Sequence, residues 1–377
     1  MNKIFFLILS LSIALPACAA SKKNPRKVAA SEFELDQTTK SELIIDDLYI
    51  PWSIEFLDKD TLIFSQKDGV LKTLHIPNKN LTDILGGPKS SEHGQGGLLD
   101  IALHPQFATN KILYFAYTKK VGSQYTTAIA NGKLNTDLSK IENLKDIFVA
   151  NNASSAGVHF GSRITFDENG HLYFGVGDRG NIDLAQDLSA AQGKIHRLKL
   201  NGETPTDNPF YNTDGALKTI WSLGHRNPQG LVFDPVTKKL YESEHGPQGG
   251  DEINIIQRGR NYGWPIITYG EEYGGGMIGE GTAKEGLEQP LHYYKPSIAP
   301  CGLEIYNHTL YRDWRGQLFS GALVQMHLNR ITISNPQEIK ETRILTDDFQ
   351  RIRDVKQSPD GKIYLATDAG KILRLVR

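Results

Sequence analysis

The sequence predicts an all-β protein, and a six-bladed β-propeller is the most economical architecture for it. One phrase recurs along the chain: an apolar pair, a turn built on Asp, Pro, Asn or Gly, and then an alternating strand. Alternating apolar runs joined by such turns are typical of β-hairpins. Few stretches show the 3.6-residue period of an amphipathic helix, which argues against an α/β fold.

The phrase occurs six times, and each copy predicts one hairpin. The copies cover residues 54–58 with 62–64, 102–105 with 112–115, 165–170 with 172–174, 231–235 with 240–241, 357–361 with 363–365, and, less clearly, 303–318. Six copies leave roughly 55 residues per unit, which is near the size of a four-stranded propeller blade. Because the spacing is irregular, a β-sandwich or two stacked β-domains stays open as an alternative.

The N-terminus predicts export. Lys3 is followed by an apolar core over residues 4–15, too short to span a bilayer, and by small residues at 17–20. We therefore predict a signal peptide over residues 1–18. Residues 15–18 also resemble a bacterial lipobox, so two outcomes stay open: lipidation of Cys18, or simple cleavage after Ala19 or Ala20.

The rest of the chain divides into a linker and one domain. Residues 19–40 are polar and charged and predict a flexible linker, and residues 41–377 form the predicted propeller domain. Cys301 is the only cysteine besides Cys18, so we expect no disulfide within the domain. The net charge of −1 argues against nucleic acid as a partner and favours a small molecule.

The most unusual residues fall between the strand phrases, where propellers place their binding sites. Residues 91–97, 157–161 and 224–230 each place a histidine among glycines before a strand, and alternation puts Arg351 and Arg353 on one strand face. The loop over residues 243–252 gathers carboxylates, carbonyls and turn residues that suit a hard cation such as calcium.

Four motifs in this order resemble the soluble quinoprotein glucose and sorbosone dehydrogenases, especially their aldose sugar dehydrogenase branch. They are His-Gly-Gln-Gly-Gly, Gly-His-Arg-Asn-Pro-Gln-Gly, Glu-His-Gly-Pro-Gln-Gly-Gly-Asp-Glu-Ile-Asn and Asn-Tyr-Gly-Trp-Pro. The resemblance implies a six-bladed propeller that binds pyrroloquinoline quinone (PQQ) and calcium in the periplasm. It also implies oxidation of aldose sugars at the anomeric carbon to lactones, with an external electron acceptor.

The resemblance assigns the catalytic roles to three residues. His159 corresponds to the general base, and Asp178 to the carboxylate that orients it. Arg226 corresponds to the cation that stabilises the quinone oxyanion. The implied reaction is hydride transfer: His159 removes the hydroxyl proton while calcium and Arg226 activate the quinone carbonyl. For Asp178, an ordinary turn residue before Arg179 stays open.

The resemblance also implies the binding residues. Cofactor contacts fall on Gln95, Arg226, Asn227, Tyr273, Ala322, Leu323, Val324, Arg351 and Arg353. The Gly246 and Pro247 carbonyls correspond to ligands of the calcium that holds the quinone, and Glu252 with the Tyr262 carbonyl to a second ion. One position departs from the branch: Val324 replaces an expected lysine, so a cation opposite the quinone acids is missing.

Two other functions stay open at this point. The first is a calcium-stabilised propeller that binds glycans or a protein partner without chemistry, which the loss of the lysine at position 324 would suit. The second is a calcium-dependent lactonase, which needs neither a quinone nor an arginine cluster. Absorbance during a quinone titration separates the three functions.

Overall fold

The computed structural model describes residues 32–335 and 338–377 of the chain. The predicted signal peptide, Cys18 and the linker up to residue 31 lie outside the described residues, so those predictions stay predictions. Within the described ranges, every helix is too short or too polar to cross a membrane.

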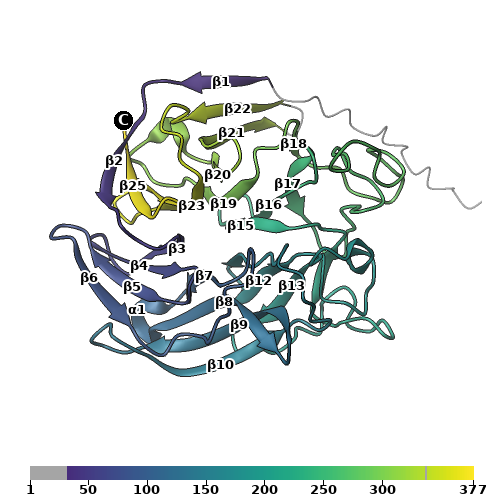
Figure 1. Cartoon of the computed structure of the whole chain (residues 1–377), viewed down its shortest axis with the longest axis horizontal. Helices are drawn as coiled ribbons and strands as arrows, with labels where there is room; N and C mark the ends of the chain where they lie inside the picture. Colours follow the sequence, from purple (N-terminus) through teal and green to yellow (C-terminus); the bar gives the residue numbers. More distant parts are fainter. Residues whose placement is uncertain (1–31, 336–337) are drawn as a thin grey trace, which may run out of the picture.

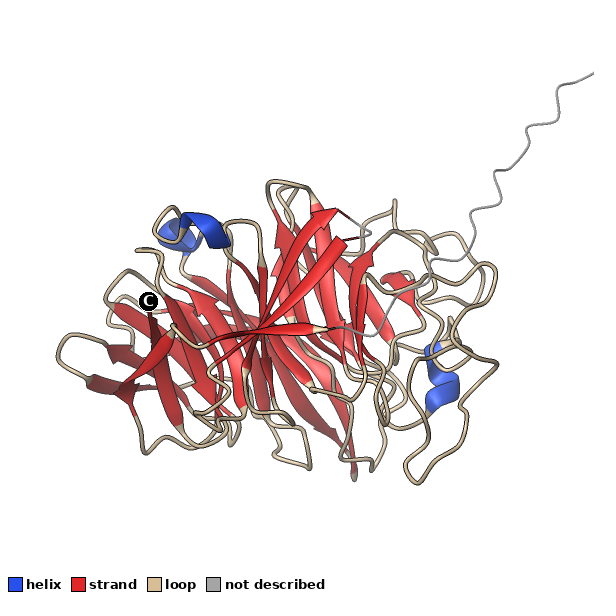
Figure 2. Cartoon of the chain, turned by 90° about the horizontal axis from the view of Figure 1, so that it is seen from above, coloured by secondary structure: helices blue, strands red, loops and turns tan. Residues whose placement is uncertain are grey.

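Six sheets stand around a common axis like the blades of a propeller (Figure 1). Each has four antiparallel strands, and one of them has a further strand added in parallel at its edge. Figure 2 shows that helix is confined to short segments, as the sequence predicts. The predicted six-bladed β-propeller is therefore confirmed.

The first three blades follow one another along the chain. The first contains β3 (Pro51–Phe56), β4 (Thr61–Gln66), β5 (Leu71–His75) and β6 (Asn80–Ile84). The second contains β7 (Leu98–Leu103), β8 (Ile112–Val121), β9 (Gln124–Leu134) and β10 (Ile141–Val149), with the short helix α1 (Phe107–Asn110) after β7. The third contains β11 (Ile164–Phe166), β12 (His171–Val176), β13 (Lys194–Lys199) and β14 (Ile220–Leu223), with the 3₁₀ helix η1 (Ile182–Ala185) after β12.

The last three blades include both ends of the described chain. The fourth contains β15 (Pro228–Asp234), β16 (Lys239–Glu244), β17 (Asp251–Ile256) and β18 (His292–Tyr294). The fifth contains β19 (Pro300–Ile305), β20 (Leu318–Ala322), β21 (Leu328–Asn335), β22 (Glu338–Ile344) and β1 (Phe33–Asp36), with the 3₁₀ helix η2 (Arg312–Trp314) after β19. The sixth contains β23 (Ile352–Gln357), β24 (Ile363–Thr367), β25 (Lys371–Val376) and β2 (Lys40–Ile45).

The core lies between the blades, because both faces of each blade pack on a neighbour. Strand β4 shows how: Leu62, Ile63 and Phe64 are all buried. Ile63 packs in a cluster shared with the second blade, whereas Leu62 and Phe64 pack on the opposite side against the sixth. Full burial of such side chains contributes about 1.5–3 kcal/mol each. The inner strands therefore read as apolar runs, and the six predicted hairpins are the two inner strands of each blade.

The N-terminal segment closes the ring. Strand β2 is the outermost strand of the last blade and pairs antiparallel with β25, with Leu43 opposite Leu373. Strand β1 pairs parallel with β22, and Phe33 lies under the Arg343 guanidinium at 3.7 Å. The segment predicted as a flexible linker thus ends in a strand over Phe33–Asp36, because the open edge of β22 offers backbone hydrogen bonds.

Loops from every blade meet at one end of the axis. The inner strands β3, β7, β11, β15, β19 and β23 contact one another in series and surround this axis. Because strands alternate in direction, the segment that enters each inner strand and the loop after the second strand open at the same end. The motifs singled out in the sequence lie in these segments.

Candidate active site

A cavity of about 430 Å³ opens at this end of the axis and is lined by loops of all six blades. Most of the predicted site residues line it. These are Gln95, His159, Arg226, Asn227, Gly246, Pro247, Tyr273, Leu323, Val324, Arg351 and Arg353. The volume falls in the range of small-molecule sites. Asp178, Ala322, Glu252 and Tyr262 are the predicted residues that lie outside this lining.

His159 and Asp178 form a hydrogen-bonded pair at the cavity wall. His159 Nδ1 lies 2.6 Å from Asp178 Oδ1, and Asp178 is fully buried behind the imidazole ring. The second carboxylate oxygen accepts a hydrogen bond from Trp264 Nε1 at 2.8 Å. Asp178 is therefore held at both oxygens, and its position fixes the tautomer in which His159 Nδ1 carries the proton and Nε2 is an acceptor.

The backbone at His159 is held in an unusual conformation. Its φ of +52° lies in the left-handed region, which is rare for residues other than glycine. Gln95 Oε1 accepts a hydrogen bond from the His159 backbone N–H at 2.8 Å. A Cβ at Gly177 would lie 2.3 Å from the His159 carbonyl oxygen, so only glycine allows this approach. Such local strain is typical of functional sites.

Arg226 and Asn227 enter the cavity just before β15. Arg226 Nη1 donates to the Gly246 carbonyl at 2.7 Å, so the guanidinium lies against the loop predicted to bind calcium. Asn227 Oδ1 accepts the Gly161 backbone N–H at 3.2 Å, which ties it to the segment that follows His159. The two neighbours therefore connect the predicted base to the predicted ion loop.

Arg351 and Arg353 share one carboxylate, as two cations on one strand face should. Asp368 Oδ2 accepts Arg351 Nε at 3.0 Å and Arg353 Nη2 at 2.8 Å, and Asp368 Oδ1 accepts Arg353 Nε at 2.8 Å. Burial opposes ionisation of Asp368, but the hydrogen bonds and charges of the two arginines outweigh it and lower its pKa. The pair keeps a net positive charge at the cavity wall.

The segment from Ala322 to Val324 divides between core and cavity. Ala322 is buried and packs in the core between the fourth and fifth blades. Leu323 lines the cavity, and its carbonyl accepts Arg351 Nη1 at 2.8 Å. Val324 also lines the cavity and is 58% exposed. Tyr273, in the glycine-rich loop opposite, is 73% exposed at the rim.

The loop at Gly246 and Pro247 is fixed from below by Asp251. This carboxylate accepts four hydrogen bonds, from the Gly246, Ile298 and Ala299 backbone N–H groups and the Ser297 hydroxyl. Burial nevertheless raises the pKa of Asp251 to about 6. His245 lines the cavity beside the loop, and burial together with the charge of Arg226 lowers its pKa to about 3, so it is neutral.

Glu252 and Tyr262 line a second, much smaller cavity of about 10 Å³ behind this loop. Glu244 and Gly246 also line it, so it lies next to the main cavity. The volume is close to that of one water molecule or one ion. Burial and the charge of Glu244 raise the pKa of Glu252 well above its ordinary value. A divalent cation would relieve this charge.

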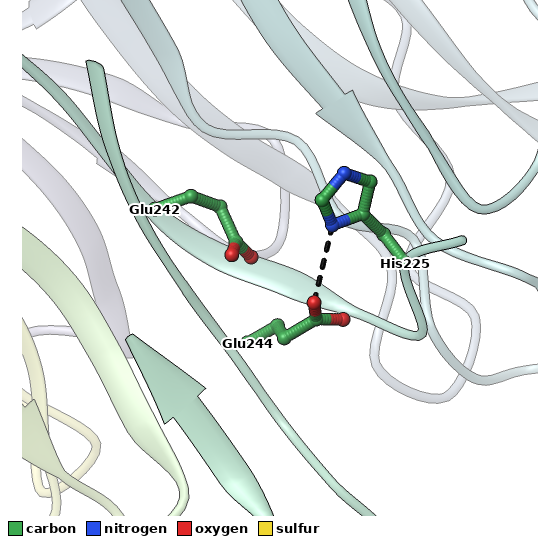
Figure 3. A group of neighbouring side chains, drawn as sticks. All are labelled: His225, Glu242 and Glu244. Atoms are coloured by element: carbon green, nitrogen blue, oxygen red, sulfur yellow. Dashed lines mark hydrogen bonds and ion pairs between the residues drawn. The ribbon is translucent and has the colours of Figure 1, made fainter. Parts of the chain in front are cut away.

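Behind the small cavity, Glu244 belongs to a buried polar group with His225 and Glu242 (Figure 3). His225 Nδ1 lies 3.1 Å from Glu244 Oε1, and its Nε2 lies 2.8 Å from the Ser222 hydroxyl. Burial and the neighbouring Glu244 charge raise the pKa of Glu242 well above its ordinary value. None of these three residues is among the predicted metal ligands, although Glu244 lies within the loop predicted to suit calcium and Glu242 directly precedes that loop.

Sequence reasoning missed several residues that the cavity uses. Trp264 lay inside a quoted motif, but its contact with Asp178 joins positions 86 residues apart. The place of Asp368 could have been predicted from the hairpin. Pairing of β23 with β24 places Thr367 opposite Ile352, and so it brings Asp368 beside the arginines. Lys67 and Trp52 line the cavity from the first blade, where no motif pointed to them.

Comparisons with known proteins agree with this geometry. A sequence model of the family described as Glucose / Sorbosone dehydrogenase matches residues 48–374. An aldose sugar dehydrogenase of Escherichia coli strain K12 is 40% identical over 345 residues, covering 90% of this chain and 93% of that protein. The crystal structure of the soluble E. coli aldose sugar dehydrogenase in its apo form has a TM-score of 0.87 at 39% identity, covering 90% and 99% of the two chains. The PQQ-bound aldose sugar dehydrogenase of Streptomyces coelicolor has a TM-score of 0.74 at 26% identity, covering 90% and 97%.

Proposed function

Because this chain belongs to the glucose/sorbosone dehydrogenase family, we propose that it is a PQQ- and calcium-dependent dehydrogenase of aldose sugars. One observation carries the proposal: a single cavity contains both a histidine held by a buried carboxylate and three arginine side chains. A propeller that only binds sugars does not need a histidine held by a buried carboxylate. A lactonase does not need a cluster of arginines.

The cavity fits PQQ in size and charge. Its lining contains four basic side chains, Lys67, Arg226, Arg351 and Arg353, against the two acidic side chains of Asp251 and Asp368. PQQ carries three carboxylates, and the planar guanidinium group binds carboxylates through two parallel hydrogen bonds. Arg351 and Arg353 are the residues we expect to hold these carboxylates, with Gln95, Asn227, Leu323 and Tyr273 around the ring system.

The neighbouring loop fits calcium. The Gly246 and Pro247 carbonyls line the main cavity, and Glu252 and Tyr262 line the small one. These are oxygen donors, which calcium prefers. The buried carboxylates of Glu244 and Glu252 lack a basic side chain in the small cavity other than Arg226. We assign one ion to Gly246 and Pro247 beside the cofactor, and a second to Glu252 and the Tyr262 carbonyl.

The chain's own residues then divide the work. His159 Nε2 accepts the proton of the anomeric hydroxyl, because Nδ1 is committed to Asp178. Asp178 stabilises the imidazolium that forms, and Arg226 presents positive charge to the same cavity. When bound, PQQ supplies the two-electron acceptor for the hydrogen that leaves the anomeric carbon. The product is a lactone, and an external acceptor reoxidises the cofactor; the N-terminal signal that the sequence predicts supports a periplasmic location for this reaction.

The proposal is tested by adding PQQ and calcium to the purified chain. We expect a saturable change in PQQ absorbance and sugar-dependent reduction of an artificial electron acceptor. A protein that takes up no PQQ contradicts the dehydrogenase function. A protein that takes up PQQ but oxidises no aldose contradicts the substrate class alone.

Replacing Asp178 with asparagine is expected to lower kcat about 100-fold, because the amide cannot hold His159 in the same tautomer. PQQ affinity should stay within about twofold, since Asp178 does not line the cavity. Steady-state rates and a PQQ titration measure the two effects. Trp264→Phe serves as the control: it removes one hydrogen bond to Asp178 and keeps the carboxylate. An equal loss in both variants would contradict a direct role for the carboxylate.

Replacing Val324 with lysine is expected to tighten PQQ binding about two- to fivefold. Val324 lines the cavity and is 58% exposed, so a lysine there adds an ammonium group near the quinone acids at the roughly 0.5–1 kcal/mol typical of exposed pairs. Val324→Met extends the side chain without charge and should leave affinity unchanged. Equilibrium titration at two salt concentrations checks the result, because only the lysine gain should shrink as salt rises.

A further inference from the structure

The fourth blade gathers three carboxylates on one face, of which Glu242 and Glu244 are buried and Glu252 is partly buried. Glu242 and Glu244 lie two residues apart on β16, and the register places Asn254 of β17 opposite Glu242 and Glu252 opposite Glu244. Residues two apart on a strand share a face, so the four side chains form one polar layer. Glu242 and Asn254 are fully buried, and Glu244 is 4% exposed.

This layer has little compensating charge. In the described part of the chain, His225 is the one basic side chain that forms an ion pair with any of the three carboxylates. Asn254 Nδ2 lies 3.1 Å from Glu242, 3.3 Å from Glu244 and 3.3 Å from Glu252, so one neutral amide serves three acids. Burying carboxylates without cations is costly, and in folded proteins such groups are paired or bind metals.

Two buried atoms of the layer also lack partners. Glu242 Oε1 and Asn254 Oδ1 have no hydrogen-bond donor within reach among the described residues. An ionised carboxylate is acceptor-only and has about four lone-pair sites, yet the Asn254 amide is the partner recorded for Glu242. These oxygens are therefore available to a ligand that accepts electron pairs.

The geometry around Glu242 suits a metal ion. One ligand atom each from His225, Glu242 and Glu244 lie within 4.8 Å of one another, and Figure 3 shows the three side chains converging. The 3.1 Å between His225 Nδ1 and Glu244 Oε1 matches an edge of an octahedron with bonds of about 2.2 Å. His225 can coordinate a metal through Nδ1 in the tautomer that carries its proton on Nε2. In that tautomer Nε2 donates a hydrogen bond to the Ser222 hydroxyl oxygen.

We propose that His225, Glu242 and Glu244 bind a divalent transition-metal ion, distinct from the calcium ions assigned above. Asn254 adds a fourth ligand when its amide turns over, because its oxygen and nitrogen are nearly isosteric. Carboxylate oxygens are hard donors that suit manganese, and imidazole is a common ligand of transition metals, so manganese is a suitable probe of this site. This site includes a nitrogen ligand. The two proposed calcium sites, at Gly246 with Pro247 and at Glu252 with the Tyr262 carbonyl, have oxygen ligands alone. The inference does not depend on the dehydrogenase activity.

The test uses the whole chain, freed of metals and PQQ, with manganese as the probe. Excess calcium is added first to fill the oxygen-only points, and MnCl2 is then titrated while electron paramagnetic resonance measures the free ion. We expect one manganese ion to bind per chain in spite of the calcium. Its pulsed spectrum should show coupling to one nitrogen, from His225.

Two variants complete the experiment. Glu242→Gln should weaken manganese binding about tenfold or more, because it removes a charged ligand. Glu271→Gln is the control, and this variant should bind manganese as the unaltered chain does. Glu271 is half exposed, lies between β17 and β18 of the same blade, and pairs with Lys295. In chelator, Glu242→Gln should melt no lower than the unaltered chain, because it removes one of three crowded acids, so a loss of binding is not a loss of folding.

The overturning results are equally direct. Absence of manganese binding in excess calcium would mean that protons, not a metal, neutralise the layer. A bound ion without nitrogen coupling would place the manganese at an oxygen-only point. Equal affinity in Glu242→Gln and the unaltered chain would remove Glu242 from the ligand set. Each of these outcomes contradicts the proposal, whether or not the chain oxidises sugars.

Discussion

Replacing His159 with alanine is expected to lower kcat by about 10²–10⁴-fold, the range that a positioned general base contributes. His159 lines the cavity and is joined to Asp178 at 2.6 Å, so its loss leaves a buried carboxylate but no proton acceptor facing the substrate. PQQ uptake should persist, because the arginine pair and the Gly246 loop are untouched. Single-turnover rates and a PQQ titration on the same preparation measure the two properties separately.

His93→Ala is the matched control for this prediction. His93 also belongs to a glycine-rich motif, but its Nε2 donates to the Ser155 carbonyl and its ring stacks on Tyr125, outside the cavity lining. Its turnover should stay within a few-fold of the unaltered chain. A comparable loss in the two variants would show that loop order, not proton transfer, limits the rate. Rescue of His159→Ala by added imidazole would support the base role further.

Replacing Arg353 with methionine is expected to weaken PQQ binding about 100-fold or more. Arg353 lines the cavity with 16% of its side chain exposed, and it forms two hydrogen bonds with Asp368. Removing one partner of a buried charge pair costs about 2–5 kcal/mol, partly because Asp368 is left with half of its compensation. Equilibrium titration of PQQ in calcium-containing buffer measures the loss without any turnover.

A double-mutant cycle separates the two causes of that loss. Asp368→Asn combined with Arg353→Met should recover part of the affinity, because the uncompensated carboxylate is gone. Arg258→Met is the control: it removes an arginine that hydrogen-bonds the Asp207 carbonyl away from the cavity, and PQQ affinity should not change. Strictly additive losses would contradict a role for Asp368 in holding the arginines.

The fold could be predicted from the sequence because every blade repeats one local pattern. Leu62, Ile63 and Phe64 illustrate it: the turn at residues 57–61 before these apolar residues indicates the hairpin, and the structure adds that the strand packs on both faces. Strand β1 was not predictable in the same way. Its four residues are mostly exposed. The strand forms because β22, which is far away in the sequence, leaves an open edge for it to pair with.

The candidate site divides along a similar line. The positions of Arg351 and Arg353 followed from strand alternation, and His159 followed from its motif. The contact that holds Asp178 did not follow, because Trp264 and Asp178 meet only when the third and fourth blades are placed side by side. The burial of Glu242 and Glu244 could not be predicted from the sequence, because it depends on strand pairing and packing within the fourth blade.

The pairing of β2 with β25 sets the order in which the protein can be completed. Lys40 lies opposite Val376, so β2, near the start of the described chain, pairs with β25 at its end. Contacts of such long sequence separation form slowly, because loop-closure entropy is lost before they contribute. A chain synthesised from its N-terminus therefore holds an unpaired β2 and an open ring until β25 has been made. During that interval the unpaired edge of β2 and the open edge of the ring can pair with other chains. Formation of β25 therefore protects the protein from aggregation.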